Sequence, residues 1–225
     1  MRARVAALFT LDEQGRMLRV NEPDGPPAPR FFLGRTSEGH EWRFRHDVDS
    51  ELCDGLVALC RAELAGSRLA PNPANIDAYL DLLGRASPIR RQWSGPAYRF
   101  PRALPEVARA VHVTTRNAAI LEPDFADWLA EVRAGQPFMA LVVEGRVVSV
   151  CCSVRIGPEV HEAGVETHRR WRGRGYGSQV VAAWAAAVRR GGTQPVYSTS
   201  WENAGSQAVA NRLGLARFGL DFHVT

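Results

Sequence analysis

The feature that most constrains this chain is a glycine-rich turn that runs directly into an apolar helix. Residues 172–178 read Arg-Gly-Arg-Gly-Tyr-Gly-Ser, and residues 179–190 continue as Gln-Val-Val-Ala-Ala-Trp-Ala-Ala-Ala-Val-Arg-Arg. Glycine tolerates left-handed and crowded conformations, so successive backbone N–H groups of the turn can point into one concavity. The helix beginning near Gly175 adds its unpaired first-turn donors and the positive end of its dipole. Residues 172–178 therefore predict an anion-binding site, which we call the glycine cradle.

Two familiar phosphate-binding patterns fit this spacing poorly. A dinucleotide-binding fold would show Gly-x-Gly-x-x-Gly, with an acidic residue roughly 20 positions further on. Here the glycines fall at 173, 175 and 177 instead. A P-loop requires Gly-Lys followed by Ser or Thr, and the chain contains no lysine. What remains is the sequence Arg-x-x-Gly-x-Gly. It is either an anion-binding turn of another type or an ordinary turn with solvated arginines.

The residues that follow the helix narrow the choice. A run of strand formers at 195–200 precedes the polar cap residues 203–206, a second helix predicted at 207–213 and a terminal strand pattern at 215–224. Together with the cradle, this order resembles the GNAT superfamily of acyl-CoA-dependent N-acyltransferases. That family has an Asn-x-x-Ser/Ala helix ending in Leu-Gly-Phe, and Leu213-Gly214-Leu215 stands at this place. Two motifs in the right order are more specific than either alone.

The resemblance implies an α/β protein with the GNAT fold, a mixed but mostly antiparallel sheet with helices on both faces. In the family the cradle holds the pyrophosphate of acetyl-CoA, and two parallel strands splay apart to receive the thioester arm. The backbones of Val165 and Thr167 would then contact the arm, and Asn203 and Ser206 would lie near it or the phosphates. The cofactor-binding residues implied are Val165, Thr167, Arg172, Gly173, Arg174, Gly175, Tyr176, Gly177, Ser178, Asn203 and Ser206.

Transfer to an amine requires a group that accepts the proton of the incoming ammonium. Alternation along the strand predicted at 159–167 places Glu162 and Glu166 on one face and His161 on the other. Glu162 is the first candidate, because its distance before Arg172 is close to that of the base in related enzymes. Glu166 is the second, with the alternative of orienting an arginine of the 169–174 cluster, and His161 is the third because imidazole titrates near neutrality. Each could instead be a solvated or ion-paired strand residue.

The usual proton donor of the family has no counterpart here. Many members carry a tyrosine in the pattern Leu-Tyr-x-x-Leu-Gly, and this chain has Ala210 at that position. A thiol with a pKa around 8.5 can leave as thiolate or take a proton from water. Ser200 and Tyr197 are alternative sources of a hydroxyl near the gap. Ala210 also keeps open a second class of function, an acyl-CoA-binding sensor or a degenerate, non-catalytic module.

The chain is predicted to divide in two near residues 88–96, where Pro88 and then Ser-Gly-Pro interrupt the pattern. Residues 1–95 are expected to form a small α+β N-terminal domain of unknown function, and residues 96–225 the acetyltransferase domain. Strands in the first part are predicted at 4–10, 17–21, 31–34 and 42–45, as two hairpins, with helices at 50–64 and 74–83. Those in the second are predicted at 97–100, 110–115, 138–143, 147–156 and 159–167, with a short helix at 125–133.

Composition limits the partners. The 28 basic residues are all arginine against 24 acids, but they are dense only at 169–174, beside the cradle, so no nucleic-acid partner is expected. No run of about 18 apolar residues and no leader sequence is visible, which favours a cytoplasmic protein without membrane contact. The four cysteines match no disulfide frame or zinc site, and no metal is expected. The sequence thus predicts acetyl transfer from acetyl-CoA to a primary amine by a monomer or homodimer. A small-molecule acceptor is favoured over a protein N-terminus.

Overall fold

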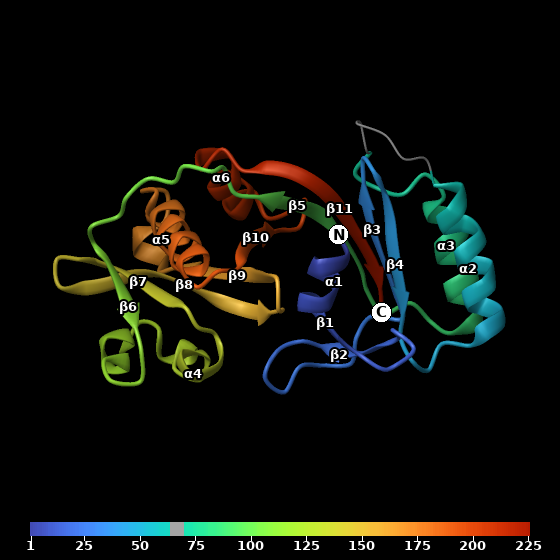
Figure 1. Cartoon of the computed structure of the whole chain (residues 1–225), viewed down its shortest axis with the longest axis horizontal. Helices are drawn as coiled ribbons and strands as arrows, with labels where there is room; N and C mark the ends of the chain where they lie inside the picture. The colour runs from blue at the N-terminus through green and yellow to red at the C-terminus, as the bar shows by residue number, and fades with distance from the viewer. Residues whose placement is uncertain (64–69) are drawn as a thin grey trace. The chain divides into compact units, whose positions relative to one another are not determined.

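The computed structural model describes residues 1–63 and 70–225, which form two compact units (Figure 1). The first unit contains Met1–Ala97, Ser198–Asn203 and Arg217–Thr225, and the second contains Tyr98–Tyr197 and Ala204–Ala216. The α/β class and the mostly antiparallel strand arrangement are as predicted. A split into separable domains at residue 95 stays a prediction, and the C-terminal segment falls in the first unit rather than the second.

The first unit is built on two hairpins and two further strands. Strands β1 (Phe9–Leu11) and β2 (Met17–Val20) pair antiparallel, as do β3 (Phe31–Thr36) and β4 (Gly39–Phe44). The larger sheet has the order β4-β3-β11-β5, with β11 at Ala216–Val224 and β5 at Gln92–Arg99. The terminal strand β11 therefore lies between β3 and β5.

Two helices cover this sheet with an apolar face (Figure 1). Helix α2 (Ser50–Ala62) begins at the predicted cap Asp49, whose carboxylate accepts from the N–H groups of Glu51 and Leu52. Helix α3 spans Ile76–Ala86. Leu64, the last residue of the predicted first helix, lies outside the described residues. The buried side chains between the helices and the sheet include Phe31, Leu33, Leu56, Tyr79, Leu83 and Phe222.

The strand predicted at 4–10 is wrong. Arg2–Leu8 forms helix α1, and the extended backbone begins only at Phe9. Alanine, arginine and leucine are good helix formers, and three alanines stand in this segment. The helix also places Val5 and Leu8 on one side, where both are buried against Phe32 and Met17. In a strand, Val5 and Leu8 would point to opposite faces, so only the helix buries both on one side.

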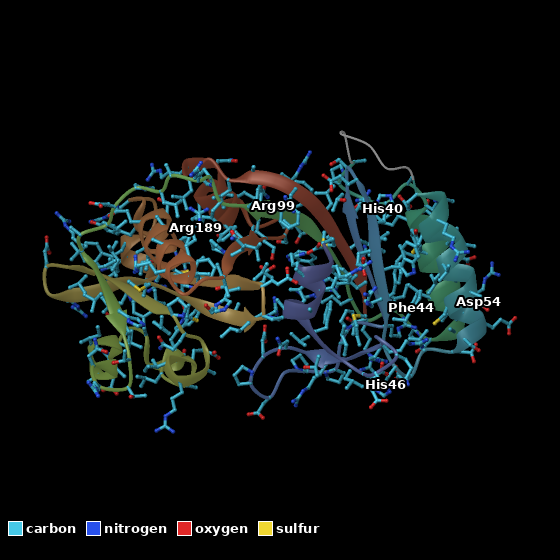
Figure 2. The ribbon with its side chains drawn as sticks, in the orientation of Figure 1. His40, Phe44, His46, Asp54, Arg99 and Arg189 are labelled. Carbon is cyan, nitrogen blue, oxygen red and sulfur yellow. The ribbon has the colours of Figure 1, made fainter. Side chains whose placement is uncertain are left out.

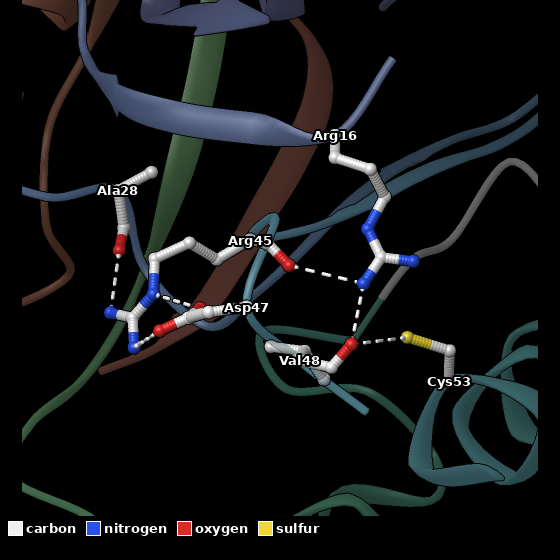
Figure 3. Close-up of polar contacts among 6 residues, drawn as sticks. All are labelled: Arg16, Ala28, Arg45, Asp47, Val48 and Cys53. Atoms are coloured by element: carbon white, nitrogen blue, oxygen red, sulfur yellow. Dashed lines mark hydrogen bonds and ion pairs between the residues drawn. The ribbon is translucent and has the colours of Figure 1, made fainter. Parts of the chain in front are cut away.

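Arginine side chains fix the backbone of the first unit (Figure 3). One Nη of Arg16 donates to the carbonyls of Arg45, at 3.2 Å, and Val48, at 2.6 Å. Arg45 in turn donates to the Ala28 carbonyl at 3.1 Å and pairs with Asp47, which lowers the pKa of that carboxyl. Burial raises the pKa of the neighbouring Cys53 thiol. This network is structural, because its donors all end on backbone oxygens or a local carboxylate.

The second unit carries five strands in the order β10-β9-β8-β7-β6. Strands β6 to β9 pair antiparallel with their neighbours, and β10 runs parallel to β9. The strand bounds are Ala110–Val113, Phe138–Val143, Arg146–Ile156, Val160–Thr167 and Gln194–Ser198 for β6 to β10. The predicted turn at Glu144 and Gly145 is present, and both residues have positive φ, as a two-residue hairpin turn requires.

Helices cover both faces of these strands, as predicted. The long helix α5 (Tyr176–Arg190) packs on one face, with Trp184 fully buried. The short elements η1 (Ala118–Leu121), η2 (Ala126–Trp128) and α4 (Glu131–Ala134) pack on the other. The single helix predicted at 125–133 is therefore replaced by a 3₁₀ turn and a separate four-residue helix.

Helix α6 (Ala204–Arg212) begins three residues before the prediction. Gly205 and Ser206 are weak helix formers and were interpreted as turn residues, but they lie in the first turn of the helix. Helix α5 is anchored at its far end by Arg189 (Figure 2), which donates to the carbonyls of Phe100, Pro101 and Arg102. The other end of α5 begins at the glycine cradle.

Candidate functional site

The glycine cradle has the backbone geometry of an anion site. Gly173 and Gly175 have φ of 78° and 80°, in the left-handed region that favours glycine. Gly175 is the N-cap of α5. Within the described part of the chain, the N–H groups of residues 173–177 donate to no backbone carbonyl. These donors and the positive end of the α5 dipole are therefore available to a ligand.

Gly177 is needed for a different reason, the close approach of α5 to its neighbours. A Cβ at this position would lie 3.2 Å from the Thr167 hydroxyl and 3.4 Å from the Val209 side chain. Thr167 is itself held at 2.8 Å by Ser149, whose hydroxyl also lies 2.8 Å from the Glu166 carbonyl oxygen. The start of α5 is thus packed against the end of β9 and against α6.

Three arginines surround the cradle. Nε of Arg172 donates to the Thr167 carbonyl at 3.0 Å, and the Arg174 guanidinium lies 4.9 Å from the Trp171 ring centroid. Arg212, on α6, lies directly over Gly175. The sequence identified the first two but not Arg212, because nothing in the local pattern links the end of α6 to the cradle. The three cations give the site a positive field that suits a polyphosphate.

Strands β9 and β10 pair along only part of their length. Their parallel pairing covers only Val160–Glu162 with Gln194–Val196. Strand β9 continues to Thr167 and keeps its pairing with β8 along the other edge. Among the described residues, the edge of β9 beyond Glu162 thus has no register partner in β10. Val165 and Thr167 both lie on this stretch.

The two candidate glutamates lie on the face of β9 away from α5. Glu162 is 1% exposed and is the last residue of β9 paired with β10. Glu166 is exposed, and its carboxylate accepts from the indole N–H of Trp128, on η2, at 2.6 Å. Glu166 is thus held by an indole rather than by an arginine of the 169–174 cluster. This contact was not visible in the sequence.

His161 is separated from the glutamates by the sheet. Its Nδ1 lies 2.9 Å from the hydroxyl of buried Ser153, which also accepts from the Trp184 indole at 3.1 Å. Burial lowers the pKa of His161. His161 is therefore tied to the α5 side of β9, on the face opposite Glu162.

The side chains considered as proton donors in place of the family tyrosine differ in their surroundings. Ala210 is fully buried. The Tyr197 hydroxyl lies 2.6 Å from that of Ser206, and burial raises the pKa of Tyr197 to about 12, so it stays protonated near neutrality. Ser200 and Asn203 belong to the first unit, whereas Ser206 and the cradle belong to the second.

The described residues show neither a metal site nor a membrane-spanning helix. No group of three or more His, Cys, Asp or Glu side chains in residues 1–63 and 70–225 could hold a metal ion. All four cysteines are buried and free. None of the helices in these ranges is long and apolar enough to cross a membrane.

Comparison with known proteins gives one family match. The family described as Acetyltransferase (GNAT) matches residues 104–215, and no curated protein matches the chain. A GCN5-related N-acetyltransferase-like protein of Streptococcus suis 89/1591 has a similar fold at 13% identity and a TM-score of 0.50, over 88% of this chain and 85% of that one. A GNAT-family acetyltransferase of Colwellia psychrerythraea gives 13% and 0.50, over 82% and 76%. A protein assigned to the GNAT family in Novosphingobium aromaticivorans gives 20% and 0.48, and the chain covers 65% of its length.

Proposed function

Residues 104–215 are a GNAT acetyltransferase family domain, and from this we propose that the protein transfers an acetyl group from acetyl-CoA to a primary amine of a small molecule. The observation that carries the proposal is the glycine cradle. Two left-handed glycines, free backbone donors and a helix N-terminus converge there with arginine side chains. An anion at that position gains hydrogen bonds and a favourable field at once.

Each part of the cofactor has a proposed partner. The pyrophosphate accepts from the backbone N–H groups of Gly173 to Ser178, in the field of Arg172 and Arg174. The thioester arm lies along the unpaired edge of β9, against the backbones of Val165 and Thr167. Tyr176 lines the start of the helix, and Ser206, in the first turn of α6, lies near the arm or the phosphates.

The chemistry follows from the position of Glu162. The substrate ammonium first loses a proton to this carboxylate, and the resulting amine attacks the thioester carbonyl carbon. The new C–N bond forms as the C–S bond breaks, and CoA leaves as thiolate. The nitrogen loses its second proton to water, and the thiolate takes a proton from water in return. Glu166 is the alternative base, held near the same face by Trp128.

The competing function is an acyl-CoA sensor without catalysis, and Ala210 is the observation that favours it. The side chain at the usual donor position is a buried methyl group, and the nearest candidate hydroxyl, on Tyr197, is engaged by Ser206. A sensor would bind acetyl-CoA and show no turnover with any amine. An enzyme would release CoA thiol, and faster with small amines than with peptides.

Calorimetric titration with acetyl-CoA tests the cradle. We expect the wild-type protein to bind with a Kd on the order of micromolar, and Gly175→Glu to lose at least about tenfold in affinity. A side chain at φ 80° is strained, and the added carboxylate repels phosphate. Gly192→Glu is the matched control, because φ is 85° there, the Cβ space is open, and the residue follows the opposite end of α5. Equal binding by both variants would reject the cradle as the cofactor site.

A further inference from the structure

We propose that Arg212 binds the pyrophosphate together with the glycine cradle, as a guanidinium supplied by a second helix. The inference rests on the proposed function and adds a residue to its cofactor site. Arg212 is the last residue of α6, outside the Arg-x-x-Gly-x-Gly sequence.

The contact between Arg212 and Gly175 is the first support. If Gly175 carried a Cβ, that atom would collide with Nη1 of Arg212 and lie 3.2 Å from its Cζ. The guanidinium therefore occupies the space that a side chain would fill. Glycine at position 175 therefore has two roles. It takes the left-handed conformation that starts α5, and its missing side chain leaves room for the Arg212 guanidinium.

The second support is the lack of a counter-charge. Arg172 is bound to the Thr167 carbonyl and Arg174 stacks on Trp171. Arg212 is exposed, and in the part of the chain that the structure describes it has neither a hydrogen bond nor an ion pair. Its neighbours are backbone N–H groups and the positive end of a helix dipole, which all disfavour a cation. An anion bound between Arg212 and these N–H groups would be attracted by both, so the arrangement becomes favourable when a ligand is present.

The chemistry of the side chain indicates which anion fits. A guanidinium presents a planar fork of donors that matches two phosphate oxygens. Arg212 lies over Gly175, which is one of the cradle residues whose backbone N–H groups face the ligand. Its partner is therefore the pyrophosphate that the cradle binds, rather than the 3′-phosphate of CoA. Helix α6 also contacts the first turn of α5 where Val209 meets Gly177, so a bound pyrophosphate would connect the two helices.

Titration of Arg212→Gln with CoA and with dephospho-CoA, which keeps the pyrophosphate and lacks the 3′-phosphate, tests this assignment. We expect Kd to rise about 10- to 100-fold, by the same factor for both ligands. Arg212→Lys should recover part of the affinity, because an ammonium keeps the charge without the fork. Arg190→Gln removes the same charge at the exposed C-terminal end of α5, and should change Kd less than about twofold.

The outcomes separate the two proposals. Wild-type affinity of Arg212→Gln for both ligands would overturn the role of Arg212 and leave the cofactor site intact. A loss seen with CoA alone would assign Arg212 to the 3′-phosphate and overturn the pyrophosphate assignment. Failure of the wild-type protein to bind either ligand would reject the proposed function, and this inference with it. Thermal melting of each variant confirms that the fold is kept.

Discussion

Replacing Glu162 with glutamine is expected to lower kcat by about 10²- to 10⁴-fold, the usual contribution of a positioned acid–base group, while the Kd for acetyl-CoA stays unchanged. Glutamine has nearly the same shape but cannot accept the proton of the ammonium. Glu162 is 1% exposed and is the last residue of β9 that pairs with β10, and it is not one of the cradle residues. Steady-state release of CoA thiol gives kcat, and calorimetry gives the affinity.

Glu166→Gln is the matched comparison, because Glu166 lies four residues further along the same face of β9. Glu166 is exposed and bonded to Trp128, so its replacement should reduce kcat less than about tenfold. The opposite ranking would make Glu166 the base. If the wild-type protein turns over and neither variant loses activity, a carboxylate base on β9 is ruled out. Binding without any turnover in the wild type would identify a sensor.

Asp221→Ala should reduce the free energy of unfolding of the first unit by about 3 to 5 kcal/mol. Asp221, on β11, forms an ion pair with Arg4 of α1, and the two side chains are 2% and 3% exposed. Removing the carboxylate leaves a buried guanidinium without its partner, which is far more costly than loss of a surface ion pair. Urea unfolding followed by tryptophan fluorescence measures the change, since Trp93 stacks on His223 in the same unit.

The double variant Arg4→Met, Asp221→Leu is its control. Two apolar side chains of similar volume remove both charges, and such replacements of buried pairs are often neutral or stabilising. We expect this variant to recover most of the lost stability. A loss below about 1 kcal/mol for Asp221→Ala alone, the range of surface ion pairs, would mean that the pair is hydrated in solution.

The sequence predicted those parts of the fold that are encoded locally. The glycine cradle and α5 follow from adjacent residues, and the strand at 138–143 agrees with β7 because a positive-φ turn marks its end. The sequence predicts a strand in place of helix α1 because residues 2–5, Arg-Ala-Arg-Val, alternate charged and apolar side chains, a pattern that also fits a strand. The pairing of β11 with β3 joins Gly219 to Thr36, and no local pattern could indicate a partner so distant in the chain.

The candidate site likewise contains some residues that the sequence indicates and others that it does not. Its backbone donors come from consecutive residues, so the motif was sufficient to find them. Arg212 and Trp128 were missed, because each reaches the site only through the packing of another element, α6 on α5 and η2 on β9. His161 was included on chemical type alone, and the structure ties it to Ser153 on the opposite face.

The position of β11 between β3 and β5 has a consequence for how the protein is made. The ribosome synthesises residues 31–36 and 92–99 long before residues 216–224. The first unit therefore lacks the strand between β3 and β5 while the second unit is being synthesised. Domains generally fold in the order of their synthesis, but here the first unit can be completed only after residues 216–224 have left the exit tunnel. A stop codon that removes β11 would therefore damage the beginning of the chain rather than its end.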